Sequence, residues 1–434
     1  MGEKKCVLCY HRILDMDDDY NMINVSPRNF EEQMKYIKNH YRITSLDRET
    51  VWEGCGGEDE TSIAISFDDG YADFMNDALS VIKKYDIPVT VFLSTEKIGS
   101  DDENWMDEII RIILKTKLLK NFFELRDEEI SGYWIIENYA QRVQFYYAFN
   151  QICRNVNKKR RNKYIDILKK WAEDFPERRS TRRILSVPEL RVLKESRLFS
   201  FGAHTESHPS LAALSPKEQY MEINRSKEFL EDVLDESINL FAYPFGSDVD
   251  YSEETIEILK ECGFKKAFTT ECKCYTADNN AYRIPRCVVP NFRGPDFERW
   301  ISNIINDTIY DNNEPIVLEE DDNRPWITYV GCMHYDRVLW QGDEQICIWG
   351  MGTSGKEIYK YIASLCQLSR VVYWGDKKTV DFEKNHLGIP VADYKKIGEY
   401  QKNNNMIVLT KGRYAWEISR ELRMHGIHNI RIYI

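Results

Sequence analysis

The chain has 434 residues, of which 43% are hydrophobic and 30% charged, and its formal net charge at pH 7 is −12. This length predicts two or three globular domains with a large core, and the negative charge argues against general nucleic-acid binding. The sequence starts without a long apolar run and contains no apolar stretch of membrane-spanning length, so neither a signal peptide nor a transmembrane segment is expected. Eleven scattered cysteines favour a reducing compartment, and we expect a cytoplasmic protein. Cys6/Cys9 and Cys272/Cys274 have the spacing of zinc half-sites, although Cys6 and Cys9 fall in a strand-like run.

Strands and helices alternate along the first part of the chain. Val7–Tyr10 is a short apolar run that ends at His11, and Ser26 with Pro27 begins a capped helix. Pro88–Leu93 is the strand that follows the next helical pattern. The alternation predicts a parallel α/β barrel, in which catalytic groups stand at the C-terminal ends of the strands.

Two adjacent carboxylates, Asp68 and Asp69, follow the strand-like run Ile63–Phe67 and precede Gly70. Neighbouring carboxylates are costly to keep together unless a cation or a proton separates their roles. A metal ligand beside a free general base is one such division of roles. An Asx-rich turn or a helix N-cap is the alternative.

Residues 105–185 interrupt the alternation with a long, charged and helical pattern, which we interpret as a helical insertion in the barrel. Between Arg154 and Arg183 the chain holds twelve lysines and arginines against four acidic residues. This patch is either a solvated helix face or a surface that attracts phosphate. Such phosphate would belong to a nucleotide-sugar, a lipid pyrophosphate carrier or an anionic membrane surface.

Two later strand-like runs also end in short polar motifs. The run before Gly202 leads to His204 and His208, and a third run ends in Pro244-Phe245-Gly246. Residues four apart on a helical turn share a face, so the two histidines can reach one ion. One carboxylate with two imidazoles and an open coordination position is typical of a catalytic metal site.

The C-terminal part has a second α/β pattern. Residues 296–342 are acidic and irregular and are predicted to be a connector. In residues 343–434 a strand is followed by the glycine pattern of a Rossmann-type turn, whose amides can bind a phosphate. The candidate nucleotide-binding residues are Gly350, Gly352, Gly355 and Asp376, the last at the position of a ribose-binding acid. The unit is short, so nucleotide binding and a degenerate docking or interaction domain both stay open.

Three motifs, taken in order, resemble those of polysaccharide deacetylases with the NodB homology domain, carbohydrate esterase family 4. They are Ser66-Phe67-Asp68-Asp69-Gly70, His204-x-x-x-His208-Pro209 and Ala242-Tyr243-Pro244-Phe245-Gly246. The resemblance covers about residues 1–295 and implies an α/β fold with a distorted (β/α) barrel of NodB type. It also implies metal-dependent removal of N- or O-acetyl groups from sugars. In this scheme Asp69, His204 and His208 hold a divalent ion, expected to be zinc, Asp68 is the general base, and the Phe245 N–H stabilises the oxyanion.

The same resemblance assigns roles to His11 and Arg286. A subgroup similar to poly-N-acetylglucosamine deacetylases carries an N-terminal Tyr-His, here Tyr10-His11, whose histidine is the general acid. Arg286 matches an arginine that lies near the catalytic aspartate in this family. Because Ala242 stands where many members have an arginine, Arg286 is expected to supply the positive charge that keeps Asp68 ionised.

The sequence therefore predicts a metal-dependent deacetylase that acts on an acetylated sugar or polysaccharide precursor. Because a cytoplasmic enzyme cannot reach exported polymer, we expect a nucleotide-linked or lipid-linked sugar as substrate. The alternative is a nucleotide-sugar oxidoreductase or binding protein that acts through residues 343–434.

Overall fold

The computed structural model describes residues 4–16, 19–21, 23–47, 61–117, 120–128, 130–137, 139–276, 279–306, 316–321, 324–331, 344–350, 355–356, 358–359, 362, 370–376, 385–386, 389–411, 418, 421–422, 425, 427 and 430–433. The chain divides into two compact units. Residues 1–117 with 150–306 form the first unit, and residues 118–149 with 307–434 form the second. In the described parts of the chain, no helix is both long enough and apolar enough to cross a membrane.

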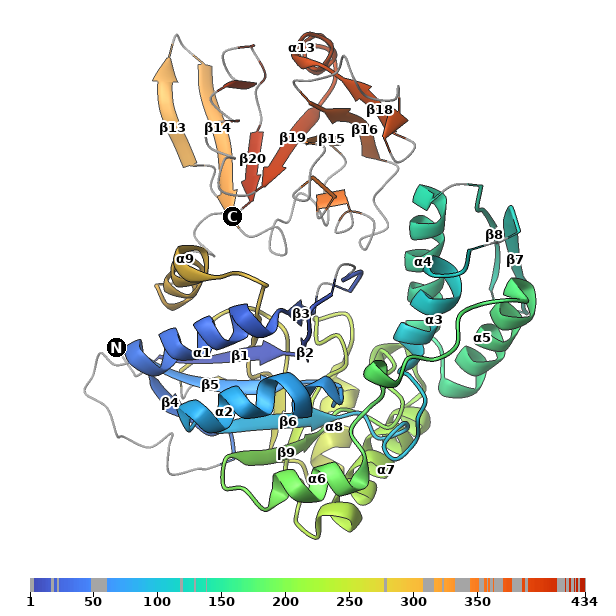
Figure 1. Cartoon of the computed structure of the whole chain (residues 1–434), viewed down its shortest axis with the longest axis vertical. Coiled ribbons are helices and arrows are strands. Elements are labelled where there is room, and N and C mark those ends of the chain that lie inside the picture. The colour runs from blue at the N-terminus through green and yellow to red at the C-terminus, as the bar shows by residue number, and fades with distance from the viewer. Residues whose placement is uncertain are drawn as a thin grey trace. The chain divides into compact units, whose positions relative to one another are not determined.

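The first unit is built on one curled parallel sheet (Figure 1). Its strands are β1 (Lys5–Tyr10), β4 (Arg42–Thr44), β5 (Ser62–Phe67), β6 (Val89–Leu93), β9 (Phe199–Ala203), β10 (Leu240–Ala242), β11 (Lys266–Phe268) and β12 (Cys287–Val288). They lie in the order β11-β10-β9-β6-β5-β1-β12, with β4 paired to β5, and the ladders between them are parallel. Parallel neighbours in chain order are the topology of a (β/α) barrel, which confirms the predicted fold class.

A short segment bridges the two edges of this sheet. Ile284 forms a parallel bridge with Phe268 of β11, and Cys287 pairs with Leu8 of β1. Arg286 lies between these two contacts and its side chain is 0% exposed. The segment that closes the ring therefore also carries a buried cation into the barrel.

A disulfide joins Cys272 to Cys287. The predicted zinc half-site at Cys272 and Cys274 is therefore wrong, because a disulfide sulfur offers no thiolate to a metal. Cys6 and Cys9 are buried in β1, as their strand-like surroundings indicated.

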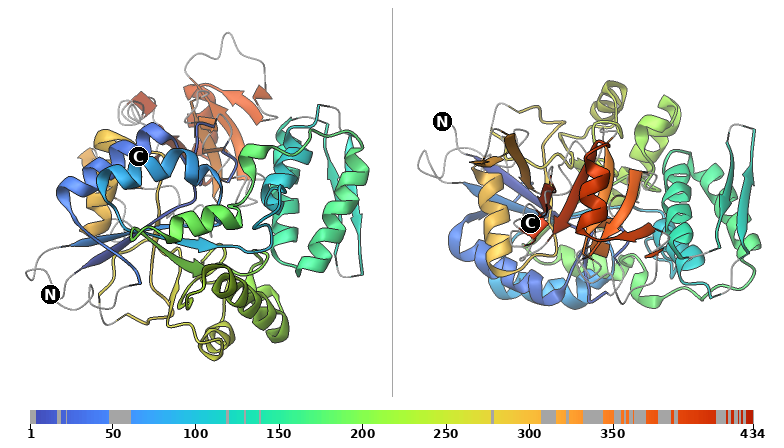
Figure 2. Two further views of the ribbon diagram at one scale, coloured as in Figure 1. Left: turned by 60° about the horizontal axis from the view of Figure 1, so that its bottom comes forward. Right: turned by 90° about the horizontal axis from the view of Figure 1, so that it is seen from above.

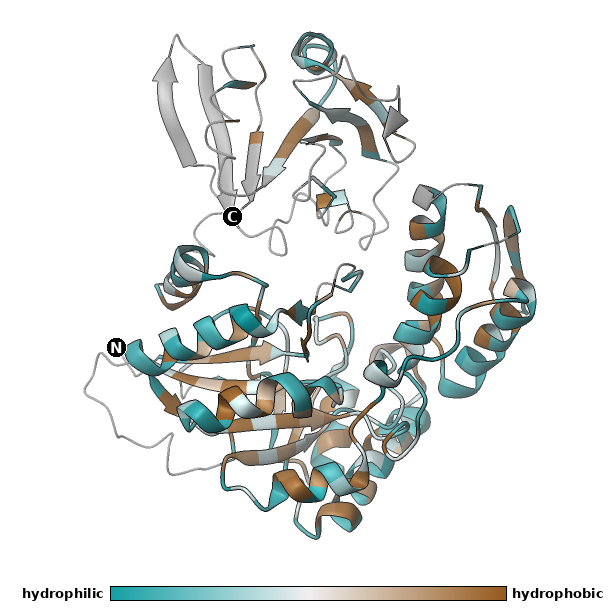
Figure 3. Cartoon of the chain, viewed as in Figure 1, coloured by the Kyte–Doolittle hydropathy of each residue, from teal (hydrophilic) through white to brown (hydrophobic). Residues whose placement is uncertain are grey.

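Helical elements follow the strands and flank the sheet (Figure 2). They are α1 (Pro27–His40), η2 (Phe74–Ala78), α2 (Leu79–Tyr85), α6 (Val187–Lys194), η4 (Leu211–Ala213), α7 (Pro216–Leu234) and α8 (Glu253–Glu261). In α1 the Ser26 side chain caps the helix by accepting a hydrogen bond from the Asn29 N–H, and Phe30, Met34 and Ile37 form its buried stripe. Figure 3 shows that the strands of this sheet are mainly hydrophobic, whereas the helices carry hydrophobic and hydrophilic residues.

The insertion predicted at residues 105–185 is only partly helical. Its helices are α3 (Trp105–Leu114), α4 (Tyr139–Arg154), α5 (Lys158–Ala172) and the short η3 (Ser180–Arg182). Residues 122–135 instead form an antiparallel hairpin of β7 (Phe122–Arg126) and β8 (Ser131–Ile135). Exposure alternates residue by residue along β7, which is the period of a strand and not of a helix. The prediction of a wholly helical insertion is wrong for this hairpin.

The connector predicted at residues 296–342 is also more regular than expected. It begins inside α9 (Gly294–Ile305), whose Phe297, Trp300, Ile301 and Ile304 are buried at helical spacing. It then contains the strands β13 (Ile316–Asp321) and β14 (Arg324–Gly331). Four acidic residues stand together at positions 319–322, and the apolar residues on either side of them have strand propensity. The prediction of an irregular connector is therefore wrong for these stretches.

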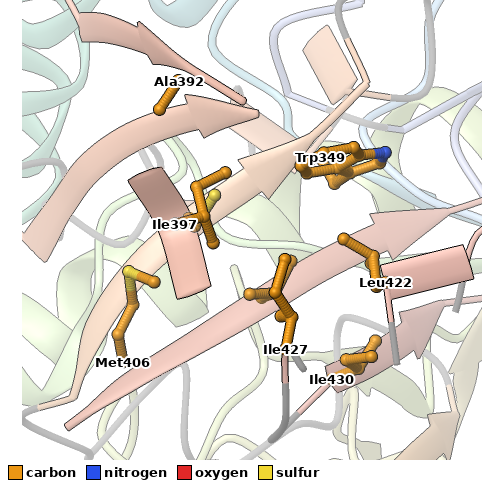
Figure 4. Close-up of a cluster of buried hydrophobic side chains, with 9 residues drawn as sticks. Trp349, Ala392, Ile397, Met406, Leu422, Ile427 and Ile430 are labelled. Carbon is orange, nitrogen blue, oxygen red and sulfur yellow. The ribbon is translucent and has the colours of Figure 1, made fainter. Parts of the chain in front are cut away.

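Residues 316–433 contain a second, mostly parallel sheet. Its other strands are β15 (Gln345–Trp349), β16 (Val371–Gly375), β17 (Asn385–His386), β18 (Ile389–Ala392), β19 (Met406–Lys411) and β20 (Ile430–Tyr433). The order is β13-β14-β20-β19-β15-β16-β18-β17, and α13 (Tyr394–Gln401) packs near β16 and β18. Its core includes Trp349, Ile397, Met406, Leu422 and Ile430 (Figure 4). The two predicted α/β patterns thus correspond to two separate sheets.

Candidate active site

The acidic pair stands where β5 ends and the chain turns sharply. Asp69 and Gly70 both have positive φ, at 69° and 77°. The Gly70 N–H donates a hydrogen bond to the Asp68 carbonyl oxygen at 2.8 Å. The positive φ of Gly70 favours glycine at this position, and a Cβ there would lie 2.5 Å from Cδ2 of Leu93, so that side chain would have to move. The turn leaves both aspartate side chains buried, at 2% and 1% exposure.

Arg286 holds Asp68 in a bidentate ion pair. Its Nη1 and Nη2 donate to the two carboxylate oxygens at 2.6 and 2.7 Å, and its Nε donates to the Thr269 carbonyl at 3.1 Å. Burial is the largest influence and favours the neutral acid, but the Arg286 charge, the neighbouring histidines and the Arg286 hydrogen bonds together outweigh it and hold the pKa of Asp68 below its ordinary value. Asp68 is therefore a buried carboxylate that stays ionised at neutral pH.

Asp69 faces His204 and His208 instead. His208 Nε2 lies 3.1 Å and His204 Nε2 lies 3.6 Å from Asp69 Oδ1. One ligand atom from each of the three residues lies within 4.8 Å of the others. Asp69 Oδ1 is buried and accepts no hydrogen bond from the described residues. An orphaned carboxylate oxygen between two imidazole nitrogens fits a divalent cation.

His204 is held in the form that a metal ligand requires. Its Nδ1 lies 2.7 Å from the Ala242 carbonyl oxygen, to which it must donate a proton. Nε2 therefore carries the lone pair that faces Asp69. Burial lowers the pKa of His204 to about 4, so the ring is neutral at neutral pH.

The turn that carries the two histidines is not helical. His204 follows β9 directly, and Thr205 and His208 adopt φ of 66° and 59°. The prediction that a helical turn brings the two histidines together is therefore wrong. Two left-handed residues fold the chain back and bring the rings to 4.8 Å between centroids.

Left-handed backbone is concentrated at this site. The described chain has seven non-glycine residues with positive φ. Three of them, Asp86, Glu173 and Asp235, are helix C-caps. The others are Asp69, Thr205, His208 and Phe245, all on the motif-bearing loops. This conformation costs about 1–2 kcal/mol for each residue with a Cβ, and such strain is typical of functional sites.

Phe245 lies against the candidate metal ligands. The centroid of its ring is 4.8 Å from that of the His208 ring. The guanidinium carbon of Arg154 lies over the Phe245 ring, 4.0 Å from its centroid. Arg154 also forms an ion pair with Asp250. The Thr270 hydroxyl donates to the Phe245 carbonyl at 2.7 Å, which fixes the peptide after it. Sequence reasoning missed Arg154, because nothing in a charged helix indicates which cation stacks on a distant ring.

His11 also lies close to the acidic pair. One of its ring nitrogens is within 4.8 Å of an Asp68 carboxylate oxygen and of the Cys9 sulfur. Cys9 was not predicted as part of this region, and burial raises the pKa of its thiol well above the ordinary value. The structure thus gathers His11, Asp68, Asp69, His204, His208 and Arg286 into one site, in which His204 Nε2 also lies 3.9 Å from Asp68 Oδ2.

A family model described as polysaccharide deacetylase matches residues 56–121 and 151–267. This part of the chain is a polysaccharide deacetylase domain. The unmatched residues 122–150 contain the β7–β8 hairpin and most of α4. The site described above lies inside the deacetylase domain and its flanking strands.

Curated and solved proteins are similar to more than half of the chain. A Staphylococcus aureus (strain MSSA476) protein named poly-beta-1,6-N-acetyl-D-glucosamine N-deacetylase is 22% identical over 267 residues, which is 61% of this chain and 68% of the relative. Streptococcus pyogenes deacetylase PplD, solved in complex with acetate, aligns at a TM-score of 0.45 and 18% identity over 70% of this chain and 99% of its own. IcaB from Ammonifex degensii aligns at 0.43 and 18% identity over 70% and 97%.

The predicted nucleotide-binding residues lie outside the deacetylase domain. Gly350 has a φ of 97°, and its carbonyl accepts a hydrogen bond from the Trp374 indole at 2.8 Å. A Cβ on Gly355 would lie 1.8 Å from that carbonyl oxygen, so close packing requires glycine there. Asp376 follows β16, and its N–H donates to Ala392. Gly352 lies outside the described residues, and nucleotide binding here stays a prediction.

Proposed function

We propose that the deacetylase domain is a metal-dependent hydrolase that removes the acetyl group of an acetylated amino sugar in a polysaccharide or its precursor. The single observation that carries this proposal is the orphaned Asp69 Oδ1 between two imidazoles, next to an Asp68 that Arg286 holds ionised. The name of the Staphylococcus aureus relative supports an N-acetyl amino sugar as the class of substrate.

The residues present fit a divalent ion, which we propose to be zinc. Asp69, His204 and His208 would hold it through one oxygen and two neutral nitrogens, a donor set typical of catalytic zinc. A bound ion would act as a Lewis acid and lower the pKa of water in the site.

The chain's own residues supply the proton transfers and charge stabilisation. Asp68 accepts the proton of the attacking water, because its pairing with Arg286 keeps it ionised. The Phe245 N–H stabilises the negative charge that develops on the acetyl oxygen. His11, close to Asp68, donates a proton to the leaving nitrogen. The products are acetate and the free amine.

An oxidoreductase acting through residues 343–434 is not favoured, because the family match falls on the deacetylase region.

The test compares two variants that remove different functions. Asp68→Asn should keep the bound ion and lower acetate release by about 10²- to 10⁴-fold, the usual contribution of a general base. His204→Ala should lose the ion itself, which elemental analysis of the purified chain measures directly. Asp86→Asn is a matched control, because Asp86 also has positive φ but caps α2 away from the site. Full zinc occupancy in His204→Ala, or unchanged turnover in Asp68→Asn, would contradict the proposal.

A further inference from the structure

A polar cavity is lined by residues that are close in sequence to the proposed catalytic residues. Its volume is about 260 Å³, and Arg12, Tyr71, Asp107, Lys115, Arg179 and Arg182 are among the residues that line it. Arg12 is the residue after His11, in the short strand β2 (Arg12–Ile13), which pairs with β3 (Asn24–Val25). Tyr71 is two residues after Asp69. The cavity is therefore placed to receive a part of the substrate that lies next to the acetyl group.

The basic run from residue 154 to 183 is mostly neutralised within the fold. Its cations form ion pairs with acidic side chains of the first unit. These pairs are Arg154–Asp250, Lys158–Glu96, Lys158–Glu206, Arg161–Glu96, Lys169–Glu108, Arg178–Asp102, Arg179–Glu103 and Arg183–Glu189. Most of the run thus has a structural role and is not a free basic surface.

Arg182 differs from these cations. Its Nη1 contacts the Met16 sulfur at 3.1 Å. Within the described part of the chain, its guanidinium forms no ion pair with a carboxylate. The half-buried Arg182 has its pKa lowered, first by burial and then by the neighbouring Arg12 charge, with Asp107 opposing. A cation held in a cavity beside other cations is stabilised by any anion that enters.

The other two arginines of the cavity are already engaged. Arg12 pairs with Asp73 at 2.7 Å and with Asp107 at 3.2 Å. Arg179 pairs with Glu103 at 2.7 Å and lies 3.5 Å from Asp107. Arg12 and Arg179 are therefore held by carboxylates, whereas Arg182 lines the same cavity and forms no carboxylate ion pair within the described residues.

The cavity also contains groups suited to hydroxyls. Asp15, Asp19, Tyr20 and Asn21 also line it. The Tyr71 hydroxyl is buried and makes no hydrogen bond of normal geometry, although Asp107 lies near it. Carboxylates, an amide and phenol groups beside one unmatched guanidinium suit a sugar that carries an anionic group.

We propose that this cavity binds a phosphate group on the acetylated sugar substrate, with Arg182 as its principal ligand. The inference rests on the proposed function for the identity of the substrate. Phosphate suits the site because its several oxygens can accept from Arg182 and its neighbours together, and because it carries more charge than a carboxylate. The phosphate would belong to an activated precursor and not to a neutral polymer.

The experiment compares paired substrates on the full chain. Acetate release is measured from N-acetylglucosamine 1-phosphate, from a nucleoside-diphosphate N-acetylglucosamine and from neutral N-acetylglucosamine oligomers. For Arg182→Met, kcat/KM on the phosphorylated sugars should fall about 10- to 100-fold relative to the neutral ones, as expected for one lost charge-assisted hydrogen bond. Arg182→Lys should recover part of that loss. The two phosphorylated substrates distinguish a monophosphate from a nucleotide carrier.

Arg178→Met is the matched control, because Arg178 belongs to the same segment but is 56% exposed and pairs with Asp102 outside the cavity. It should leave the preference for phosphorylated sugars unchanged. Titration calorimetry with inorganic phosphate provides a readout that does not depend on turnover, and Arg182→Met should weaken that binding. Equal losses on phosphorylated and neutral substrates would overturn the inference, as would unchanged phosphate binding. A chain that binds phosphate through Arg182 but deacetylates none of the sugars would refute the proposed function and keep the phosphate site.

Discussion

The pair between Arg286 and Asp68 offers a quantitative test of the site. Both side chains are almost fully buried, at 0% and 2% exposure, so water does not screen them. Replacing Arg286 by Met leaves a buried carboxylate without a partner, and it also removes the donor to the Thr269 carbonyl. Breaking a buried ion pair from one side typically costs about 3–5 kcal/mol. We expect the unfolding free energy of Arg286→Met to fall by that amount at pH 7.

The pH dependence of this loss follows from the pKa of Asp68. In the native chain Arg286 lowers that pKa, so the pair's contribution is present above the unfolded value of about 3.9 and disappears as the pH falls through the native value. Arg286→Met removes the largest influence that opposes burial, so the pKa of Asp68 rises relative to the native chain and the carboxyl takes up a proton more readily in the folded state. The difference between native and variant chains should therefore shrink as the pH falls from 7 towards 4.

Urea denaturation of the native chain and its variants measures these differences. Adding Asp68→Asn to Arg286→Met should recover most of the loss, because a neutral amide needs no cation. Arg283→Met is the control: Arg283 pairs with Glu253 at the surface, where both partners are well exposed, and should cost about 1 kcal/mol or less. If Arg286→Met cost no more than Arg283→Met, Asp68 would not be an isolated buried charge and its assignment as an ionised base would fail.

Two further predictions concern other parts of the deacetylase domain. His11→Ala should keep bound metal and slow the hydrolysis of amides far more than that of activated aryl esters, whose leaving groups need little protonation; equal losses on both substrates would remove His11 from the mechanism. Replacing Cys272 and Cys287 together by Ser should lower the unfolding free energy by about 3 kcal/mol, the chain-entropy estimate for a bridge across 15 residues. An unchanged urea midpoint, with or without reductant, would show that this bridge does not form.

The sequence predicted the candidate site residues best where they directly follow a strand. Asp68, Asp69, His204 and Phe245 follow buried strands of one parallel sheet, in which β9 and β10 are adjacent and β6 separates them from β5, and such strand ends converge on one edge. The (β/α) architecture followed from the same alternation. The position of Arg286, 218 residues from Asp68 along the chain, came only from the resemblance, because local pattern carries no information about so distant a contact.

Other features could not be obtained from local pattern at all. His204 and His208 have helical spacing but meet through two left-handed residues, a conformation that their side chains do not favour. Arg154 stacks on Phe245 through a contact that depends on where a whole helix packs. The hairpin at residues 122–135 and the strands at 316–331 were obscured by charged residues, which mask a period of two.

The four left-handed residues at the acidic pair and its neighbouring loops affect the abundance of this protein in a cell, because they lower its stability. At roughly 1–2 kcal/mol each they consume a large share of the 5–15 kcal/mol by which a typical domain resists unfolding. Asp69 and His208, two of the strained residues, are also proposed ligands, so an ion bound only by the native state would return part of that free energy. Cells starved of the metal would then degrade the protein faster, and its abundance would fall together with its activity. A selection for thermal stability alone would favour glycine at these same positions and would erase the site.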